Sequence, residues 1–147
     1  MTDTSELQKY GFENVGFWQK DPNDSQKIFA KITKFEDERV IYAFAESKIV
    51  RYIGIVKSSK RTFKKRLAEY RSPYTNGKGS TNREVGIKII ELLKNGVEVA
   101  IFALKPNQNT ACGSYNGLEV DLISGLESSL IEKFNLANSD KGWNKSS

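Results

Sequence analysis

Residues 40–56 read VIYAFAESKIVRYIGIV, two apolar runs joined by a short polar connection. Both runs, 39–46 and 49–57, are rich in β-branched and aromatic residues, which favour β-strands. Only Ser47-Lys48, or a turn of similar length, separates the two runs. The stretch therefore predicts an antiparallel hairpin.

The elements that follow place this hairpin in an α+β fold. A third strand is predicted over 97–104, after two helices, and a long helix follows it. The sequence therefore predicts a three-stranded antiparallel sheet flanked by helices. The helices are expected at 60–71, with Ser58 or Ser59 as N-cap, at 81–95, with a capping box from Thr81 to Glu84, and at 116–134, with a capping box from Asn116 to Glu119.

The sequence predicts one domain preceded by an N-terminal extension. Residues 39–147 carry the predicted sheet and helices and form one domain of ordinary size. Residues 1–38 are interpreted as an N-terminal extension of that domain. Within this extension the loosely alternating segment 26–33 is a candidate edge strand.

Composition excludes several classes of site. The 147 residues include one cysteine and no histidine, so an intramolecular disulfide, a Cys/His zinc site and a His-based catalytic pair are excluded. The longest apolar runs are six residues, too short to span a membrane. The N-terminus lacks the basic and apolar regions of a signal peptide. We expect a cytoplasmic protein of a bacterial or phage-infected cell, with no membrane partner.

Positive charge is concentrated in the middle of the chain. Residues 48–94 contain 13 Lys and Arg against three Glu, whereas the remainder carries a net charge of −5. A basic block on a globular chain indicates a polyanionic partner, nucleic acid first. A solvated, lysine-rich surface is the alternative.

Glu127 is the most informative acidic residue. On the predicted helix it lies among apolar neighbours, including Ile123, Leu130 and Ile131. A carboxylate in an apolar setting requires a partner. An arginine in a structural ion pair and a divalent cation both meet that requirement, and the residue alone does not decide between them.

The hairpin supplies a second candidate cluster. Tyr42 and Tyr52 lie on its facing strands, near Gly54. Such tyrosines are often only strand formers that pack across a sheet. Here they precede a helix in which Arg66 borders the apolar stripe, and arginine grips phosphate with a rigid planar fork. A phosphate site and simple packing both remain open at this point.

The order and spacing of five motifs between residues 39 and 145 resemble the GIY-YIG nuclease superfamily. The similarity is greatest to its small stand-alone members, the type II restriction endonucleases and the phage endonucleases of the endonuclease II type. Arg61 competes with Arg66 as the motif arginine. The five motifs are Val40-Ile41-Tyr42, Tyr52-Ile53-Gly54, Arg66 with Tyr70, Glu127, and Asn144.

The resemblance implies a Mg²⁺-dependent endodeoxyribonuclease, with Mn²⁺ able to substitute. Glu127 would bind the metal, and Arg66 would neutralise charge on the scissile phosphate. Tyr42 would activate the attacking water, with Lys57 or Lys60 lowering its pKa. Tyr52 would bridge active-site groups or hydrogen-bond the phosphate, and Asn144 would hold the site or the phosphate in place. Tyr70 matches a position where the family has histidine or tyrosine.

Double-stranded DNA is the implied partner. The basic helix and the loop after it are expected to contact the DNA backbone, and some of their side chains to reach base edges. A homodimer or higher symmetric oligomer is expected, because a duplex break needs two cuts. The predicted DNA-binding residues are Lys60, Arg61, Lys64, Lys65, Arg71, Asn76, Lys78, Asn82 and Arg83.

Three alternatives accompany this interpretation. The first is a non-catalytic DNA-binding protein on the same scaffold, with Glu127 in a structural ion pair. The second is a repair nuclease that acts on damaged or branched DNA. The third is a protein–protein module with a lysine-rich surface, which would show no affinity for DNA at low salt.

Overall fold

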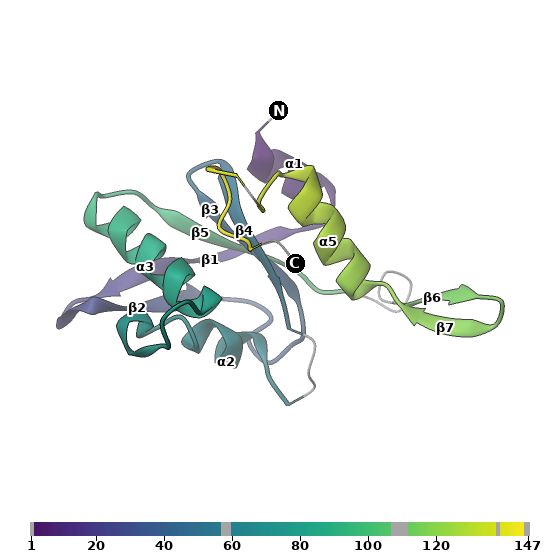
Figure 1. Cartoon of the computed structure of the whole chain (residues 1–147), viewed down its shortest axis with the longest axis horizontal. Coiled ribbons are helices and arrows are strands. Elements are labelled where there is room, and N and C mark those ends of the chain that lie inside the picture. The colour runs from purple at the N-terminus through teal and green to yellow at the C-terminus, as the bar shows by residue number, and fades with distance from the viewer. Residues whose placement is uncertain (1, 57–59, 107–111, 138, 146–147) are drawn as a thin grey trace.

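The computed structural model describes residues 2–56, 60–106, 112–137 and 139–145. It is an α+β structure in which one sheet has helices on both of its faces (Figure 1). The elements in chain order are α1 (Asp3–Lys9), β1 (Glu13–Asp21), β2 (Asp24–Ile32), β3 (Ile41–Glu46), β4 (Ile49–Ile55), α2 (Phe63–Ala68), the 3-10 helix η1 (Pro73–Thr75), α3 (Thr81–Lys94), β5 (Val99–Leu104), β6 (Cys112–Tyr115), β7 (Leu118–Asp121) and α5 (Ile123–Lys133).

The main sheet has five strands in the order β2-β1-β5-β3-β4, and all neighbouring strands are antiparallel. The predicted hairpin is confirmed as β3 and β4, with Tyr42 opposite Gly54 and Phe44 opposite Tyr52. The predicted edge strand corresponds to β2, and the predicted third strand to β5. The expected three-stranded sheet is therefore too small, because residues before position 39 supply β1 and β2.

Strand β1 was not predicted, because an irregularity interrupts the alternation of its buried and exposed residues. Its register against β5 shifts between Asn14 and Gly16. Its two buried side chains, Val15 and Trp18, are consequently three positions apart, so the two-residue period of a strand is lost. Trp18 nevertheless packs in the centre of the core, edge-on to Phe44.

Two of the predicted helices are confirmed as α2 and α3, with shifted ends. Helix α2 is shorter at both ends than expected and has Thr62 as its N-cap. The predicted caps Ser58 and Ser59 lie outside the described residues. Helix α3 has Ser80 as its cap, one residue before the predicted Thr81. In both helices the cap hydroxyl accepts a backbone N–H three residues later, which satisfies a donor of the first turn.

The predicted helix over 116–134 is wrong in its first part, where β6 and β7 form a hairpin that projects from the body (Figure 1). Asn116 and Gly117 in its turn have φ of 50° and 84°, the combination that two-residue hairpin turns favour. Leu118 is 67% exposed, so it belongs to no buried stripe. Glu119 lies within β7 and is not a capping residue. The preference of Asn-Gly for a hairpin turn therefore outweighs the four-residue spacing of the leucines, which had predicted a helix.

Helices cover both faces of β3, which explains its continuous apolar run. Tyr42 and Phe44 pack with residues of α2 and α3, whereas Ile41, Ala43 and Ala45 pack with residues of α1 and α5. The sheet thus holds the tyrosines against α2 and presents α5 on its other side (Figure 1). Among the described residues, none of the helices has the length and apolarity that a membrane crossing requires.

Candidate active site

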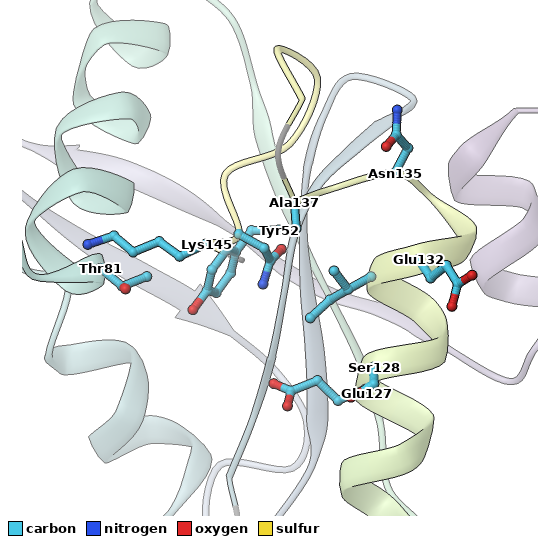
Figure 2. A pocket seen from close by; sticks show the side chains of 10 residues that line it. Tyr52, Thr81, Glu127, Ser128, Glu132, Asn135, Ala137 and Lys145 are labelled. Atoms are coloured by element: carbon cyan, nitrogen blue, oxygen red, sulfur yellow. The ribbon is translucent and has the colours of Figure 1, made fainter. Parts of the chain in front are cut away.

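Two pockets share two lining residues, Tyr52 and Glu127, and Figure 2 shows the larger of them. The larger has a volume of about 650 Å³ and the smaller of about 370 Å³. Each has room for several polar groups of a ligand. Beyond the shared pair, the larger pocket is lined by Thr81, Ser128, Ile131, Glu132, Asn135, Ala137, Asn144 and Lys145, and the smaller by Gly54, Ile55, Val56, Arg61 and Arg66.

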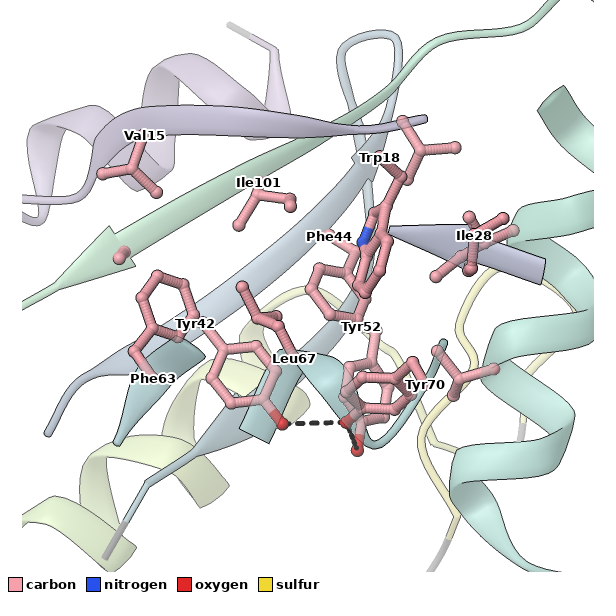
Figure 3. Packing of buried hydrophobic residues seen from close by; sticks show 14 of the residues in the cluster. Val15, Trp18, Ile28, Tyr42, Phe44, Tyr52, Phe63, Leu67, Tyr70 and Ile101 are labelled. Atoms are coloured by element: carbon pink, nitrogen blue, oxygen red, sulfur yellow. Dashed lines mark hydrogen bonds between the residues drawn. The ribbon is translucent and has the colours of Figure 1, made fainter. Parts of the chain in front are cut away.

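Three tyrosine hydroxyls from different elements meet beside these pockets (Figure 3). The hydroxyls of Tyr42, on β3, and Tyr70, which follows α2, are 2.8 Å apart. The Tyr70 hydroxyl donates to that of Tyr52, on β4, across 3.5 Å. Tyr42 and Tyr70 are fully buried, and Tyr52 alone of the three lines the pockets. The hydroxyls therefore lead from the interior of the protein to the pocket wall.

The two inner phenols are held in their neutral form. Burial, and next the neighbouring Tyr52, raise the pKa of Tyr42 well above its ordinary value. Burial and next Tyr42 raise the pKa of Tyr70 in the same direction. Low-dielectric surroundings disfavour the phenolate, so both groups act as hydrogen-bonding groups at neutral pH. The predicted role of Tyr42 in water activation remains a prediction. Its phenol lies against Gly54, which lines the smaller pocket.

Gly54 makes room for the Tyr42 ring. The two residues face each other across the β3–β4 pair, and a β-carbon at position 54 would overlap the Tyr42 phenol. Any larger residue would force the ring, and with it the Tyr42–Tyr70 hydrogen bond, out of place. Packing against Tyr42 thus explains why the Tyr52-Ile53-Gly54 motif ends in glycine.

Arg66 is fixed on three sides. Its Nη1 donates to Asn82 Oδ1 at 3.0 Å and to Glu69 Oε1 at 3.1 Å, and its guanidinium carbon lies 4.8 Å from the centre of the Tyr70 ring. Burial opposes its charge, but the neighbouring phenols and Glu69 raise its pKa, so it stays a cation. Arg61 lines the same pocket, and its side chain is 54% exposed against 15% for Arg66. Both candidates for the motif arginine therefore lie at one site.

Glu127 extends from α5 toward the side of the pocket that holds Tyr52 (Figure 2). The side chain is partly exposed, less buried than the predicted apolar setting implied. The difference arises because α5 faces the sheet with Leu130, while Leu126 and Ile131 are only partly buried. A carboxylate at the shared wall of two open pockets is accessible to water and to ions.

Asn144 fastens the C-terminal segment to the outer edge of β4. Its Nδ2 donates to the carbonyl of Ile53 at 2.9 Å, and its Oδ1 accepts the Ile53 N–H at 3.1 Å. The backbone N–H of Trp143 donates to the Arg51 carbonyl at 2.7 Å. This asparagine mimics a paired strand and covers the edge beside Tyr52. Its role at the site remains a prediction.

The predicted DNA-binding residues separate into two groups. Six of them are exposed around α2 and the loop after it, whereas the other three are engaged within the protein. Asn76 and Asn82 bond to Glu69 and Arg66, and Arg83 donates to three backbone carbonyls between residues 73 and 76. The exposed group is Lys60, Arg61, Lys64, Lys65, Arg71 and Lys78.

Lys57, the predicted helper of Tyr42, lies outside the described residues. Lys145, at the larger pocket, and Glu69, behind the two arginines, are absent from the predicted site. The three-residue spacing of Arg66 and Glu69 on a helix is a pairing signal that the sequence does contain.

Comparison with solved structures identifies two similar folds. A bacteriophage T4 EndoII mutant superposes with a TM-score of 0.67 and 21% identity, over 90% of this chain and 96% of that one. The restriction endonuclease HPY188I in complex with product DNA gives a TM-score of 0.55 and 20% identity, over 91% of this chain and 79% of that one. No family model and no curated protein matches the sequence. The chain therefore has a fold that two endonucleases share.

Proposed function

We propose that this protein is a Mg²⁺-dependent endodeoxyribonuclease with a GIY-YIG-type site, similar in action to restriction or phage endonucleases on double-stranded DNA. One observation carries the proposal: Tyr52 and Glu127 share a pocket with Arg61 and Arg66. The fold shared with two endonucleases, one of them in complex with product DNA, supports it.

The donor set of the smaller pocket suits Mg²⁺. Magnesium is typically held by one or two carboxylates, with water and substrate phosphate oxygens completing its shell. Glu127 offers one carboxylate on the wall of a pocket of about 370 Å³, where two arginines are placed to receive a phosphate. When bound, such an ion polarises the phosphoryl group and stabilises the departing oxygen.

The other groups act on the phosphate and on the attacking water. Arg66, already fixed by Glu69 and Asn82, stabilises charge on the phosphoryl oxygens without reorganising. Tyr52 is the hydroxyl that meets the ligand, so it hydrogen-bonds the attacking water or the phosphate. Tyr42 acts behind it, through Tyr70. Lys57 remains the proposed helper in proton removal.

The exposed lysines and arginines around α2 supply contacts to the DNA backbone. Such contacts give affinity and salt dependence and leave sequence choice to other groups. We also propose a homodimer, because each chain carries one such site and a double-strand break needs two cuts. Light scattering with and without DNA tests the dimer, and a monomer that makes clean double-strand breaks would contradict it.

Incubation of the protein with supercoiled plasmid tests the function. We expect nicked and linear products with Mg²⁺ or Mn²⁺, and none with a chelator. Binding without any cutting would favour the non-catalytic DNA-binding alternative. Cutting confined to branched or damaged duplexes would favour the repair alternative.

A further inference from the structure

Glu69 lies between the two arginines of the smaller pocket. Its Oε1 accepts a hydrogen bond from Arg66 Nη1 at 3.1 Å, and its Oε2 forms an ion pair with Arg61 Nε across 3.2 Å. Arg61 and Arg66 both line the pocket, whereas the Glu69 carboxylate does not. Glu69 therefore stands behind the arginines and touches both.

The contact joins three segments that are separate in the sequence. Arg61 precedes α2, Glu69 is the C-cap of α2, and Asn82 is in the first turn of α3. Asn82 Nδ2 donates to Glu69 Oε1 at 3.4 Å, while its Oδ1 accepts from Arg66. The amide thus holds the same carboxylate and the same guanidinium from a second helix.

Electrostatics gives this carboxylate a specific effect. Two guanidinium groups on one pocket wall repel each other, and a carboxylate bonded to both offsets that repulsion. The two arginines differ in freedom, since the Arg61 side chain is 54% exposed and that of Arg66 is 15% exposed. Without the carboxylate, the exposed Arg61 would leave the wall first.

We propose that Glu69 is a positioning residue that joins Arg61 and Arg66 into one phosphate-binding wall, with Asn82 as its second support. The proposal rests on the proposed nuclease function and deepens it. Both arginines then serve the scissile phosphate together, Arg66 as the fixed member and Arg61 as the adjustable one. Glu69 touches neither DNA nor metal, and it acts through the arginines alone.

Two variants separate the charge of Glu69 from its hydrogen bonds. Glu69→Gln keeps an acceptor for Arg66 but loses the ion pair with Arg61, and Glu69→Ala loses both. The matched control is Glu91→Gln, an exposed residue of α3 whose change alters the net charge equally. Duplex affinity is measured in chelator, and the cleavage rate in single-turnover reactions at saturating DNA with Mg²⁺.

The two measurements should move in opposite directions. We expect Glu69→Gln and Glu69→Ala to bind the duplex about threefold more tightly than the control, because a negative charge near the phosphate is gone. We expect cleavage to fall about tenfold for Glu69→Gln and about 100-fold for Glu69→Ala, since a misplaced catalytic group costs rate at that scale. Partial rescue by glutamine is the signature of positioning.

Solvent exchange of the Arg61 side chain tests the proposal without any cleavage assay. In ¹⁵N spectra of the whole protein, the Arg61 Nε–H signal should be protected from solvent exchange in the wild type and lose that protection in Glu69→Ala. This result supports the wall even if the plasmid assay finds no cutting, which would refute only the nuclease. Unchanged protection of the Arg61 Nε–H in Glu69→Ala would overturn the proposal. So would a duplex affinity and a cleavage rate that both fall in proportion to the fraction of folded variant. Values within twofold of Glu91→Gln for both measurements would overturn it as well.

Discussion

Replacing Tyr42 and Tyr70 together by phenylalanine should make the protein more resistant to alkali. Both rings stay in the core, and the 2.8 Å hydrogen bond loses both of its partners at once. Removing a buried donor and acceptor together is nearly neutral, so we expect a change of no more than about 1 kcal/mol at pH 8. Either single change is worse, because it leaves one buried hydroxyl with a poorer partner.

The magnitude at high pH follows from proton linkage. Burial raises the pKa of both phenols in the folded protein, whereas the unfolded chain ionises them near the ordinary value of about 10. Their contribution to stability is thus complete below pH 10 and is lost as the pH rises toward the folded-state values. The unfolded chain is half ionised at pH 10 and almost fully ionised at pH 11, so each group costs about 1 kcal/mol between these two pH values and the pair costs about 2 kcal/mol.

Urea unfolding at pH 8, 10 and 11 measures this difference. We expect the free energy of unfolding of the wild type to fall by about 2 kcal/mol more than that of the double variant between pH 10 and 11. All other ionisable residues are present in both proteins, so the difference between the two pH profiles follows the two phenols. Parallel pH profiles would refute the reasoning, because they would mean that the two phenols ionise freely in the folded state.

Three further predictions concern the C-terminal clamp, the outer tyrosine and the basic block. Asn144→Ala removes two hydrogen bonds to Ile53 and should lower the free energy of unfolding by about 2–3 kcal/mol, measured in urea; a loss under 0.5 kcal/mol would contradict the clamp. Tyr52→Phe should slow single-turnover cleavage about 100-fold and more than Tyr42→Phe does, and the reverse order would return water activation to Tyr42 itself. Duplex affinity should fall with salt at a log–log slope near −4 to −5 if residues 48–94 neutralise about five phosphates, and a flat response would favour the protein–protein alternative.

Local sequence patterns predicted the parts of the fold that rest on local signals. The β3–β4 hairpin follows from its apolar runs and short turn, and α3 from its apolar stripe and cap. Strand β1 could not be predicted, because the register shift next to Gly16 places the buried Val15 and Trp18 three positions apart instead of the even spacing of a regular strand. The β6–β7 hairpin had a readable Asn-Gly turn, but the leucine spacing beside it pointed to a helix.

The candidate site was predictable only where chemistry and spacing agreed. Tyr52, Arg66 and Glu127 stand out as residue types that a phosphate or a metal requires, and the structure brings all three to one pocket. The contact of Glu69 with Arg61 depends on how the chain turns into α2, and that of Asn82 depends on how α2 meets α3. Such contacts between elements arise from tertiary packing, which the sequence pattern does not encode locally.

The measurement that tests the central claim most directly is plasmid cleavage in Mg²⁺ by Glu127→Gln, with Glu119→Gln as the matched control on the exposed β7 strand. Glutamine keeps the shape of Glu127 and removes the anionic oxygen that Mg²⁺ requires. We predict that Glu127→Gln cuts about 1000-fold more slowly than the control, because a bound metal contributes several kcal/mol to the transition state. Its thermal stability and DNA binding should match or exceed those of the control. A variant that cuts within tenfold of the control would contradict the account, as would one that loses about 3–5 kcal/mol of stability, the cost of breaking a buried ion pair.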